Sequence, residues 1–219
     1  MVLPDRIIWV VRHAEREDNI NPYWRKLPEA VGLGRDNSML SARGRFQARE
    51  CATRFSTVNL AHIFASPFDR TMETASIIAD RKGLLVKPEP GLCEVLGECQ
   101  RPPGFWSTDR LKTKFPLADI NYQSIYVKET LPEEKWGDDS CIPRLRRVLP
   151  ELLKEHEGDL LLVSHGAPIG AIHYVWGSSF TYVGQATVSK FVETNKGVHL
   201  EYSGDSSHLS DRSNLRPLG

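Results

Sequence analysis

The expected fold is decided by residues 7–16, which read Ile7-Ile8-Trp9-Val10-Val11-Arg12-His13-Ala14-Glu15-Arg16. Five apolar residues, β-branched except for Trp9, run directly into a cluster of charge. A continuous apolar run bounded in this way is typical of a strand that is buried on both faces of a sheet. Ligands of open α/β sheets bind at the carboxyl ends of the strands, which is where Arg12, His13 and Arg16 fall. Two guanidinium groups beside an imidazole favour an anionic ligand, most simply a phosphate.

Length and composition exclude several classes of protein. The chain has 219 residues, which is enough for one large domain with a sizeable core. Lys plus Arg and Asp plus Glu number 28 each, so no basic excess indicates nucleic acid as a partner. No apolar run approaches the ~20 residues of a membrane span, and the N-terminal residues lack the apolar core of a signal peptide. We expect a cytoplasmic protein without nucleic acid or membrane partners.

The cysteines favour neither a metal centre nor a disulfide framework. Cys51, Cys93, Cys99 and Cys141 lie far apart, and none of them forms a Cys-x-x-Cys pair. Reduced thiols are the ordinary state of such cysteines in the cytosol. We therefore predict no metal site.

Downstream of the first strand, the sequence alternates between helix and strand patterns. Helices are predicted from Ser41 to Phe55 and over 68–82, 140–156 and 167–176. Strands are predicted over 62–66, 84–86, 159–164, 186–192 and 198–202, the last two as a hairpin. Residues 17–40 and 96–139 have no clear period and are expected as insertions over the site. The tail from about residue 203 is polar and expected to be frayed. Strands that alternate with helices predict one α/β domain over residues 1–219.

The candidate chemistry lies at the ends of the predicted strands. His13 and His165 each follow a strand, and Arg70 lies in a strand-to-helix turn. If these strands are neighbours, two imidazoles converge with Arg12, Arg16 and Arg70. Three guanidinium groups can bind the oxygens of a phosphoryl group, whose transfer depends on positioning and on charge stabilisation. A neutral imidazole nitrogen can attack phosphorus, and the leaving oxygen then needs a proton from a nearby carboxylic acid.

These residues resemble the motifs of the histidine phosphatase superfamily, also called phosphoglycerate mutase-like. The family's leading Arg-His-Gly is matched by Arg12-His13-Ala14, with Ala in place of Gly. The other elements follow in the family's order as Leu40-Ser41-x-x-Gly44-x-x-Gln47-Ala48, Ser66-Pro67-x-x-Arg70-Thr71-x-x-Thr74-Ala75 and Ser164-His165-Gly166. The resemblance implies a three-layer α/β/α sandwich with a mostly parallel central sheet. It implies neither a metal nor another cofactor.

The resemblance also implies a role for each matched residue. His13 would be the phosphorylated nucleophile, and Glu94 the proton donor. Arg12, Arg70 and His165 would hold the phosphoryl group, with Gly166 beside them at the substrate. Ala14 is the departure from the family pattern, because the backbone of the family's Gly approaches the phosphate closely. An Ala is tolerable there if its φ stays negative.

A narrower resemblance rests on Arg-His-x-Glu-Arg, on Tyr23-Trp24 and on Glu-Pro-Gly-Leu-x-Glu, which ends at Glu94. These features are similar to the phosphatase domains of the suppressor-of-T-cell-receptor-signalling proteins and to ecdysteroid-phosphate phosphatases. The resemblance implies activity on phosphotyrosine or a bulky phosphomonoester. The substrate would accordingly be a phosphorylated small molecule or a phosphoprotein. Arg16 would line the phosphate pocket, and Tyr23 and Trp24 could form a substrate wall. It also makes a homodimer plausible.

Three functions are therefore open at this point. The first is a phosphatase that acts on aryl or otherwise bulky phosphate esters. The second is a phosphoglycerate mutase, against which the sequence after Glu15 argues because it is not of the mutase type. The third is a catalytically weak phosphate-binding scaffold, which Ala14 motivates. Glu94 argues against a pure binding module, because binding alone needs no acid.

Overall fold

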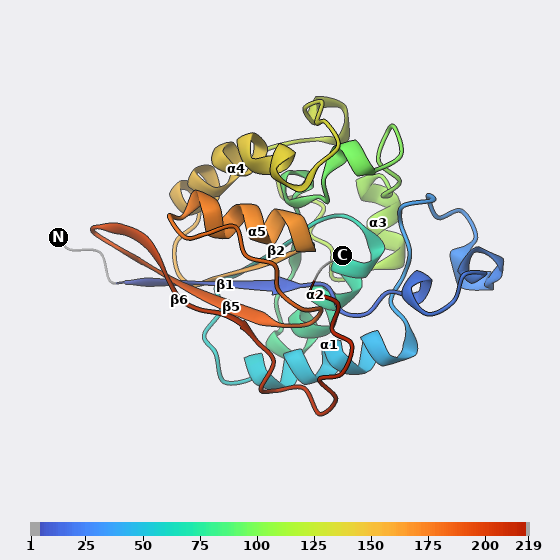
Figure 1. Ribbon diagram of the computed structural model, residues 1–219, viewed down its shortest axis with the longest axis horizontal. Coiled ribbons are helices and arrows are strands. Elements are labelled where there is room, and N and C mark those ends of the chain that lie inside the picture. The colour runs from blue at the N-terminus through green and yellow to red at the C-terminus, as the bar shows by residue number, and fades with distance from the viewer. Residues whose placement is uncertain (1–4, 218–219) are drawn as a thin grey trace.

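The computed structural model describes residues 5–217 and shows a mixed sheet between two layers of helices (Figure 1). The strands are β1 (Arg6–Arg12), β2 (His62–Ala65), β3 (Val86–Pro88), β4 (Leu160–Ser164), β5 (Val188–Thr194) and β6 (Gly197–Asp205). Their order in the sheet is β3-β2-β4-β1-β5-β6. The first four strands of this order run parallel, and β5 and β6 join as an antiparallel pair. The expected α/β/α sandwich with a mostly parallel sheet is confirmed.

Helices cover both faces of the sheet. The α-helices are α1 (Ala42–Phe55), α2 (Asp69–Lys82), α3 (Thr108–Lys114), α4 (Ile142–Glu155) and α5 (Gly166–Val175). Figure 1 shows α4 and α5 on one side of the sheet and α1 and α2 on the other. Side chains of β1 alternate between the two resulting cores: Trp9 and Val11 pack with α1 and α2, and Ile8 and Val10 with α4 and α5. The apolar run is therefore buried on both faces, as predicted.

The register of β1 and β4 determines where the two histidines lie. The strands are parallel neighbours, with Arg12 opposite Ser164. The His13 amide continues the pairing and donates to the Ser164 carbonyl at 3.0 Å. Side chains that follow the two strands must therefore emerge next to each other at one edge of the sheet. The expectation that these strands are neighbours is confirmed.

The start of α1 is fixed by its N-cap and by a close backbone contact. Ser41 Oγ accepts from the Gly44 amide at 2.9 Å, which is the N-cap bond expected from the sequence. A Cβ on Gly44 would lie only 2.1 Å from the Glu15 carbonyl oxygen. Glycine is needed at this position because the first turn of α1 packs directly on the backbone that follows His13.

The structure corrects two boundaries of the sequence analysis. The third strand spans Val86–Pro88 rather than 84–86, because Pro88 is tolerated at the end of an edge strand. The tail does not begin at residue 203, since β6 continues to Asp205. Nor does it fray there: the Leu209 side chain is 3% exposed and belongs to the core beside α1 and α2.

We predict that Gly44→Ala lowers the free energy of unfolding by about 1–3 kcal/mol, the range typical of overpacking. The added methyl has to displace the Glu15 carbonyl, which is backbone and cannot move independently. Urea unfolding followed by circular dichroism measures the change. Gly83→Ala is the control: its φ is +65° but a Cβ there meets no atom within 4 Å, so it isolates backbone strain. A Gly44→Ala loss no larger than that of Gly83→Ala would contradict the close contact.

Candidate active site

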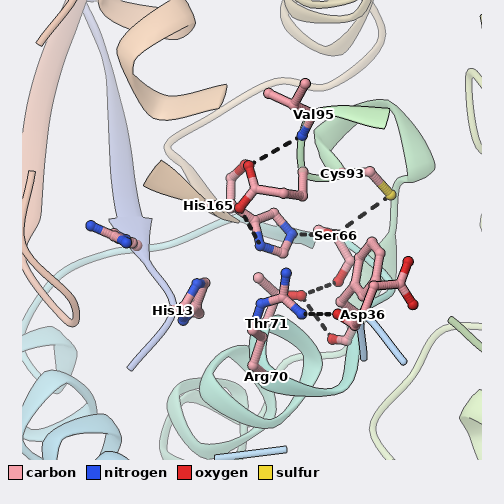
Figure 2. A network of polar contacts seen from close by, with 12 residues as sticks. His13, Asp36, Ser66, Arg70, Thr71, Cys93, Val95 and His165 are labelled. Carbon is pink, nitrogen blue, oxygen red and sulfur yellow. Dashed lines mark hydrogen bonds and ion pairs between the residues drawn. The ribbon is translucent and has the colours of Figure 1, made fainter. Parts of the chain in front are cut away.

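His13 is held in one orientation at the carboxyl end of β1. Its side chain is buried, and Nδ1 lies 2.8 Å from the Ala14 carbonyl oxygen. A carbonyl can only accept, so Nδ1 carries the proton of the neutral ring and Nε2 keeps its lone pair. The ring centroid lies 5.3 Å from that of His165. Figure 2 shows both rings facing the same space as the Arg70 guanidinium. This geometry presents Nε2 of His13 as a nucleophile.

His165 occupies the N-cap position of α5, and its ring lies between Ser66 and Glu94. Its Nε2 lies 2.8 Å from Ser66 Oγ. Its Nδ1 is buried without a hydrogen-bond partner and lies 3.7 Å from Oε2 of Glu94. The Glu94 side chain is itself 20% exposed, and its Oε1 accepts from the Val95 amide at 3.1 Å. A carboxyl group, one open ring nitrogen and the His13 ring therefore surround one space.

Arg12 is buried beside the two histidines, and no carboxylate of residues 5–217 pairs with it. Its Nη1 donates to the carbonyls of Val183 and Arg216, at 2.8 and 2.6 Å. Its Nε is buried and makes no hydrogen bond. A Cβ on Gly166 would lie 3.2 Å from Cζ of Arg12, so this glycine lets the guanidinium lie against the start of α5. Carbonyls hold one side of Arg12 and leave its remaining donors for another acceptor.

Arg70 completes the cationic lining from the first turn of α2. Its Nη1 donates to the Asp36 carbonyl at 2.9 Å, and its buried Nε makes no hydrogen bond (Figure 2). Within residues 5–217, neither Arg70 nor Arg12 forms an ion pair. Arg16 differs, because its Nε donates to Asp18 Oδ1 at 2.8 Å. Two buried guanidinium groups without a counterion form a site that an anion would complete.

This positive charge controls the protonation of the histidines. Burial, followed by the charges of Arg70, Arg12 and Arg16, holds the pKa of His13 well below its ordinary value of 6.5. Burial, followed by Arg70, His13 and the other arginines, lowers the pKa of His165 in the same direction. Burial also lowers the pKa of Arg12 to about 10. His13 is therefore a neutral base at physiological pH, which is the form that can attack phosphorus.

The remaining predicted residues take different places. Ala14 is fully buried in the core beside α1 and α2 and is not among the residues with positive φ. Trp24 is buried in a small cluster with Ala30, Leu33 and Met39. Its neighbour Tyr23 is 66% exposed and lies under the Lys26 ammonium, 4.7 Å from the ring centroid. Trp24 thus packs within the loop, and a role of Tyr23 and Trp24 in substrate binding stays a prediction.

The sequence analysis missed several residues that hold the site together. Ser66 was named only as part of a motif and without a role of its own, yet its hydroxyl contacts His165. Arg144 was not singled out, and it is buried against the loop that carries Glu94. Asp36 also went unnoticed, and its carbonyl binds Arg70. The sequence gives little signal for these roles, because they depend on contacts between residues that are far apart in the chain. For Arg144 the sequence offered one indication of a buried role: it is a basic residue on the apolar face of the helix predicted over 140–156.

The described part of the chain offers neither a metal cluster nor a membrane-spanning helix. Between residues 5 and 217, no three His, Cys, Asp or Glu side chains come together in a way that could hold a metal ion. In the same residues, no helix combines the length and apolar composition needed to cross a bilayer. The four cysteines are free thiols.

Two histidines lie at the carboxyl edge of an α/β sheet with two arginines that have no counterion among residues 5–217, and together they define the phosphoryl-transfer class of site. The chain belongs to the histidine phosphatase superfamily (branch 1), whose sequence pattern matches residues 8–179.

Relatives of the chain include both mutases and phosphatases. It is 30% identical over 171 residues to the probable phosphoglycerate mutase GpmB of Enterobacter sp. (strain 638), covering 75% of this chain and 72% of the relative. It is 32% identical, again over 171 residues and with the same coverage, to phosphoserine phosphatase 1 of Hydrogenobacter thermophilus. Its fold is similar to that of the ecdysone phosphate phosphatase from Bombix mori in complex with tungstate. That likeness has a TM-score of 0.67 at 21% identity and covers 90% of this chain and 92% of the other.

The lowered histidine pKa values predict that the protein loses stability on acidification. Below pH 6.5 the unfolded chain protonates these histidines while the folded protein does not, so each one lowers the free energy of unfolding as pH falls. For each such histidine, the slope of the free energy of unfolding against pH approaches about 1.4 kcal/mol per pH unit. Urea unfolding between pH 7 and 5 should therefore show a shallower slope in His165→Asn than in the wild type. His199→Asn, at an exposed position, is the control variant; a slope in His165→Asn no shallower than in the wild type and the control would refute the assignment.

Proposed function

We propose that the protein is a phosphomonoester hydrolase that works through a phosphohistidine on His13 and prefers aryl or otherwise bulky phosphate esters. The observation that carries the proposal is the bond from Nδ1 of His13 to the Ala14 carbonyl. It leaves Nε2 unprotonated and aimed into the space that Arg70 and His165 share (Figure 2). Membership in the superfamily supports phosphoryl transfer in general, and the resemblance noted in the sequence supports this particular nucleophile.

The proposed reaction has two steps. In the first, the Nε2 lone pair attacks phosphorus while the bond from phosphorus to the ester oxygen breaks, and Glu94 gives its proton to the leaving oxygen. Arg12 and Arg70 stabilise the phosphoryl oxygens through donors that no protein group occupies. In the second, the Glu94 carboxylate takes a proton from water, the resulting hydroxide equivalent attacks phosphorus, and the P–N bond breaks. His13 returns to its neutral state, and inorganic phosphate leaves.

The charges around Glu94 favour esters without a second acidic group. The pKa of Glu98 is raised by burial and by the negative charges of Glu94 and Asp138, so these acids lie close to one another. A substrate carboxylate close to these acids would be repelled, and Arg16 is already paired with Asp18. The distribution supports hydrolysis of phosphomonoesters whose alcohol part carries no acidic group over a mutase reaction. Similarity to the fold of an ecdysone phosphate phosphatase is consistent with a bulky alcohol.

The phosphoenzyme gives the first functional prediction. Rapid quench of the protein with a ³²P-labelled aryl phosphate should trap acid-labile, base-stable label on His13. His13→Ala should abolish the label and lower kcat by on the order of 10³-fold or more, as expected when a covalent nucleophile is removed. His199→Ala is the control, because its side chain is exposed on β6.

Three outcomes would overturn parts of this proposal. Turnover that survives in His13→Ala would exclude the assigned nucleophile. Phosphate binding without any turnover would favour the scaffold. Isomerisation of 3-phosphoglycerate that is faster than hydrolysis of aryl phosphates would favour the mutase. A homodimer and a cytoplasmic location stay predictions.

The proton donor gives a second prediction, which depends on the leaving group. Phenoxides with electron-withdrawing groups leave without a proton, whereas alkoxides require one. Glu94→Gln should therefore lower kcat/KM for an alkyl phosphate by about 10²–10⁴-fold but lower that for 4-nitrophenyl phosphate by less than about tenfold. Glu155→Gln, at an exposed position in α4, serves as the control. Equal losses for both esters in Glu94→Gln would show that Glu94 is not the donor.

A further inference from the structure

The segment that carries Glu94 has little regular structure of its own. After β3, the chain forms only two single 3₁₀ turns in this segment, Pro90–Leu92 and Leu96–Glu98. Glu94 lies between them. A loop carboxylate is usually mobile, since its backbone is not held by a helix or strand ladder. General acid catalysis nevertheless requires the carboxyl group to stay within hydrogen-bond reach of the leaving oxygen. Some other part of the protein must therefore fix this backbone.

Arg144 uses every donor of its guanidinium group, and most of them bind this loop. Its side chain projects from α4, is fully buried and makes five hydrogen bonds. Three of them go to carbonyl oxygens of the loop, those of Gly91 at 2.8 Å, Cys93 at 2.9 Å and Glu94 at 3.1 Å. The planar fork of a guanidinium suits this task, because it directs several donors in fixed directions at once. The backbone on the amino-terminal side of Glu94 is thus attached to α4.

Glu134 completes the attachment from the other side. It accepts from Nε of Arg144 at 2.7 Å and from Nη2 at 3.1 Å, so the two form a buried bidentate ion pair. Its Oε2 also accepts from the Leu96 amide at 2.8 Å. The pair therefore holds the loop on both sides of the Glu94 side chain. Arg144 binds three carbonyls up to and including that of Glu94, and Glu134 binds the amide of Leu96.

Stability alone does not explain such a pair. Burying two charges carries a large desolvation cost, and well-packed apolar residues often replace a buried ion pair without loss of stability. An apolar pair would, however, leave the loop carbonyls at 91, 93 and 94 without their donor. The bonds that Arg144 makes are specific to the loop, since three of its five donors serve this backbone.

We propose that Arg144 and Glu134 are positioning residues that fix the proton donor Glu94 beside His165. They touch neither the substrate nor the reacting atoms and act only through the loop backbone. The proposal rests on the proposed function, in which Glu94 protonates the leaving oxygen. It predicts that disturbing the pair damages proton donation selectively and spares the attack by His13, which β1 holds independently.

The test compares leaving groups in single and double variants. Arg144→Lys keeps the charge but cannot reproduce the fork. We expect kcat/KM for an alkyl phosphate to fall by about 10–100-fold, the scale of a small displacement of a catalytic group, and that for 4-nitrophenyl phosphate to fall by less than about threefold. In the Glu94→Gln background, Arg144→Lys should cause no further loss with the alkyl ester, because both changes remove the same contribution. Arg146→Lys, on the exposed side of α4, is the matched control.

The outcomes separate this proposal from the one on which it rests. If Glu94→Gln discriminates between the esters but Arg144→Lys lowers both equally, or if the two losses multiply, the positioning role is refuted and the donor role stands. If Glu94→Gln itself does not discriminate, both are refuted, while trapping of the phosphohistidine still tests the nucleophile. Should Arg144→Lys fail to fold by circular dichroism, Glu134→Gln replaces it, with the exposed Glu133→Gln as its control. The same selective loss with the alkyl ester is then required.

Discussion

The uncompensated positive charge of Arg12 and Arg70 is the constraint on which the rest of the site depends. Both guanidinium groups are buried at the carboxyl edge of the sheet, and neither is paired with a carboxylate in the described structure. Charge buried in this way is costly unless other groups supply hydrogen bonds. Backbone carbonyls do so in both cases, from Val183 and Arg216 for Arg12 and from Asp36 for Arg70. These carbonyls stabilise the cations without neutralising them, so the site keeps its attraction for an anion.

The same charge determines how His13 can react. His13 stays neutral first because it is buried and then because its charged form would be repelled by Arg70, Arg12 and Arg16. The Ala14 carbonyl then selects which nitrogen carries the proton. Electrostatics thus provides the lone pair, and a single backbone contact directs it into the site. The proposed proton donor is held differently, since Glu94 lies on a loop that Arg144 attaches to α4.

The sequence predicted those features that depend on residues close together in the chain, and it did not predict most of those that depend on residues far apart. The strand that ends in Arg12-His13 and the helix that begins after Ser41 are encoded locally, by an apolar run and by a capping residue, and both were predicted correctly. The convergence of His13 and His165 required only that β1 and β4 be neighbours. The contacts of Ser66 and Arg144 could not be predicted from local sequence patterns. Ser66 contacts a residue 99 positions away, and Arg144 contacts residues 50–53 positions away. The tail was misjudged for the same reason, since polar composition conceals the packing of Leu209.

Ala14 shows how the structure can change the meaning of a departure from a family pattern. The sequence suggested that its methyl group could crowd the phosphate and so weaken catalysis. In the fold, however, Ala14 is fully buried in the core beside α1 and α2, and its amide donates to Thr74 Oγ1 at 3.2 Å. The methyl group packs with apolar residues, while the carbonyl of the same residue orients His13. The substitution therefore gives no steric reason for a loss of activity, and the scaffold hypothesis loses the observation that motivated it.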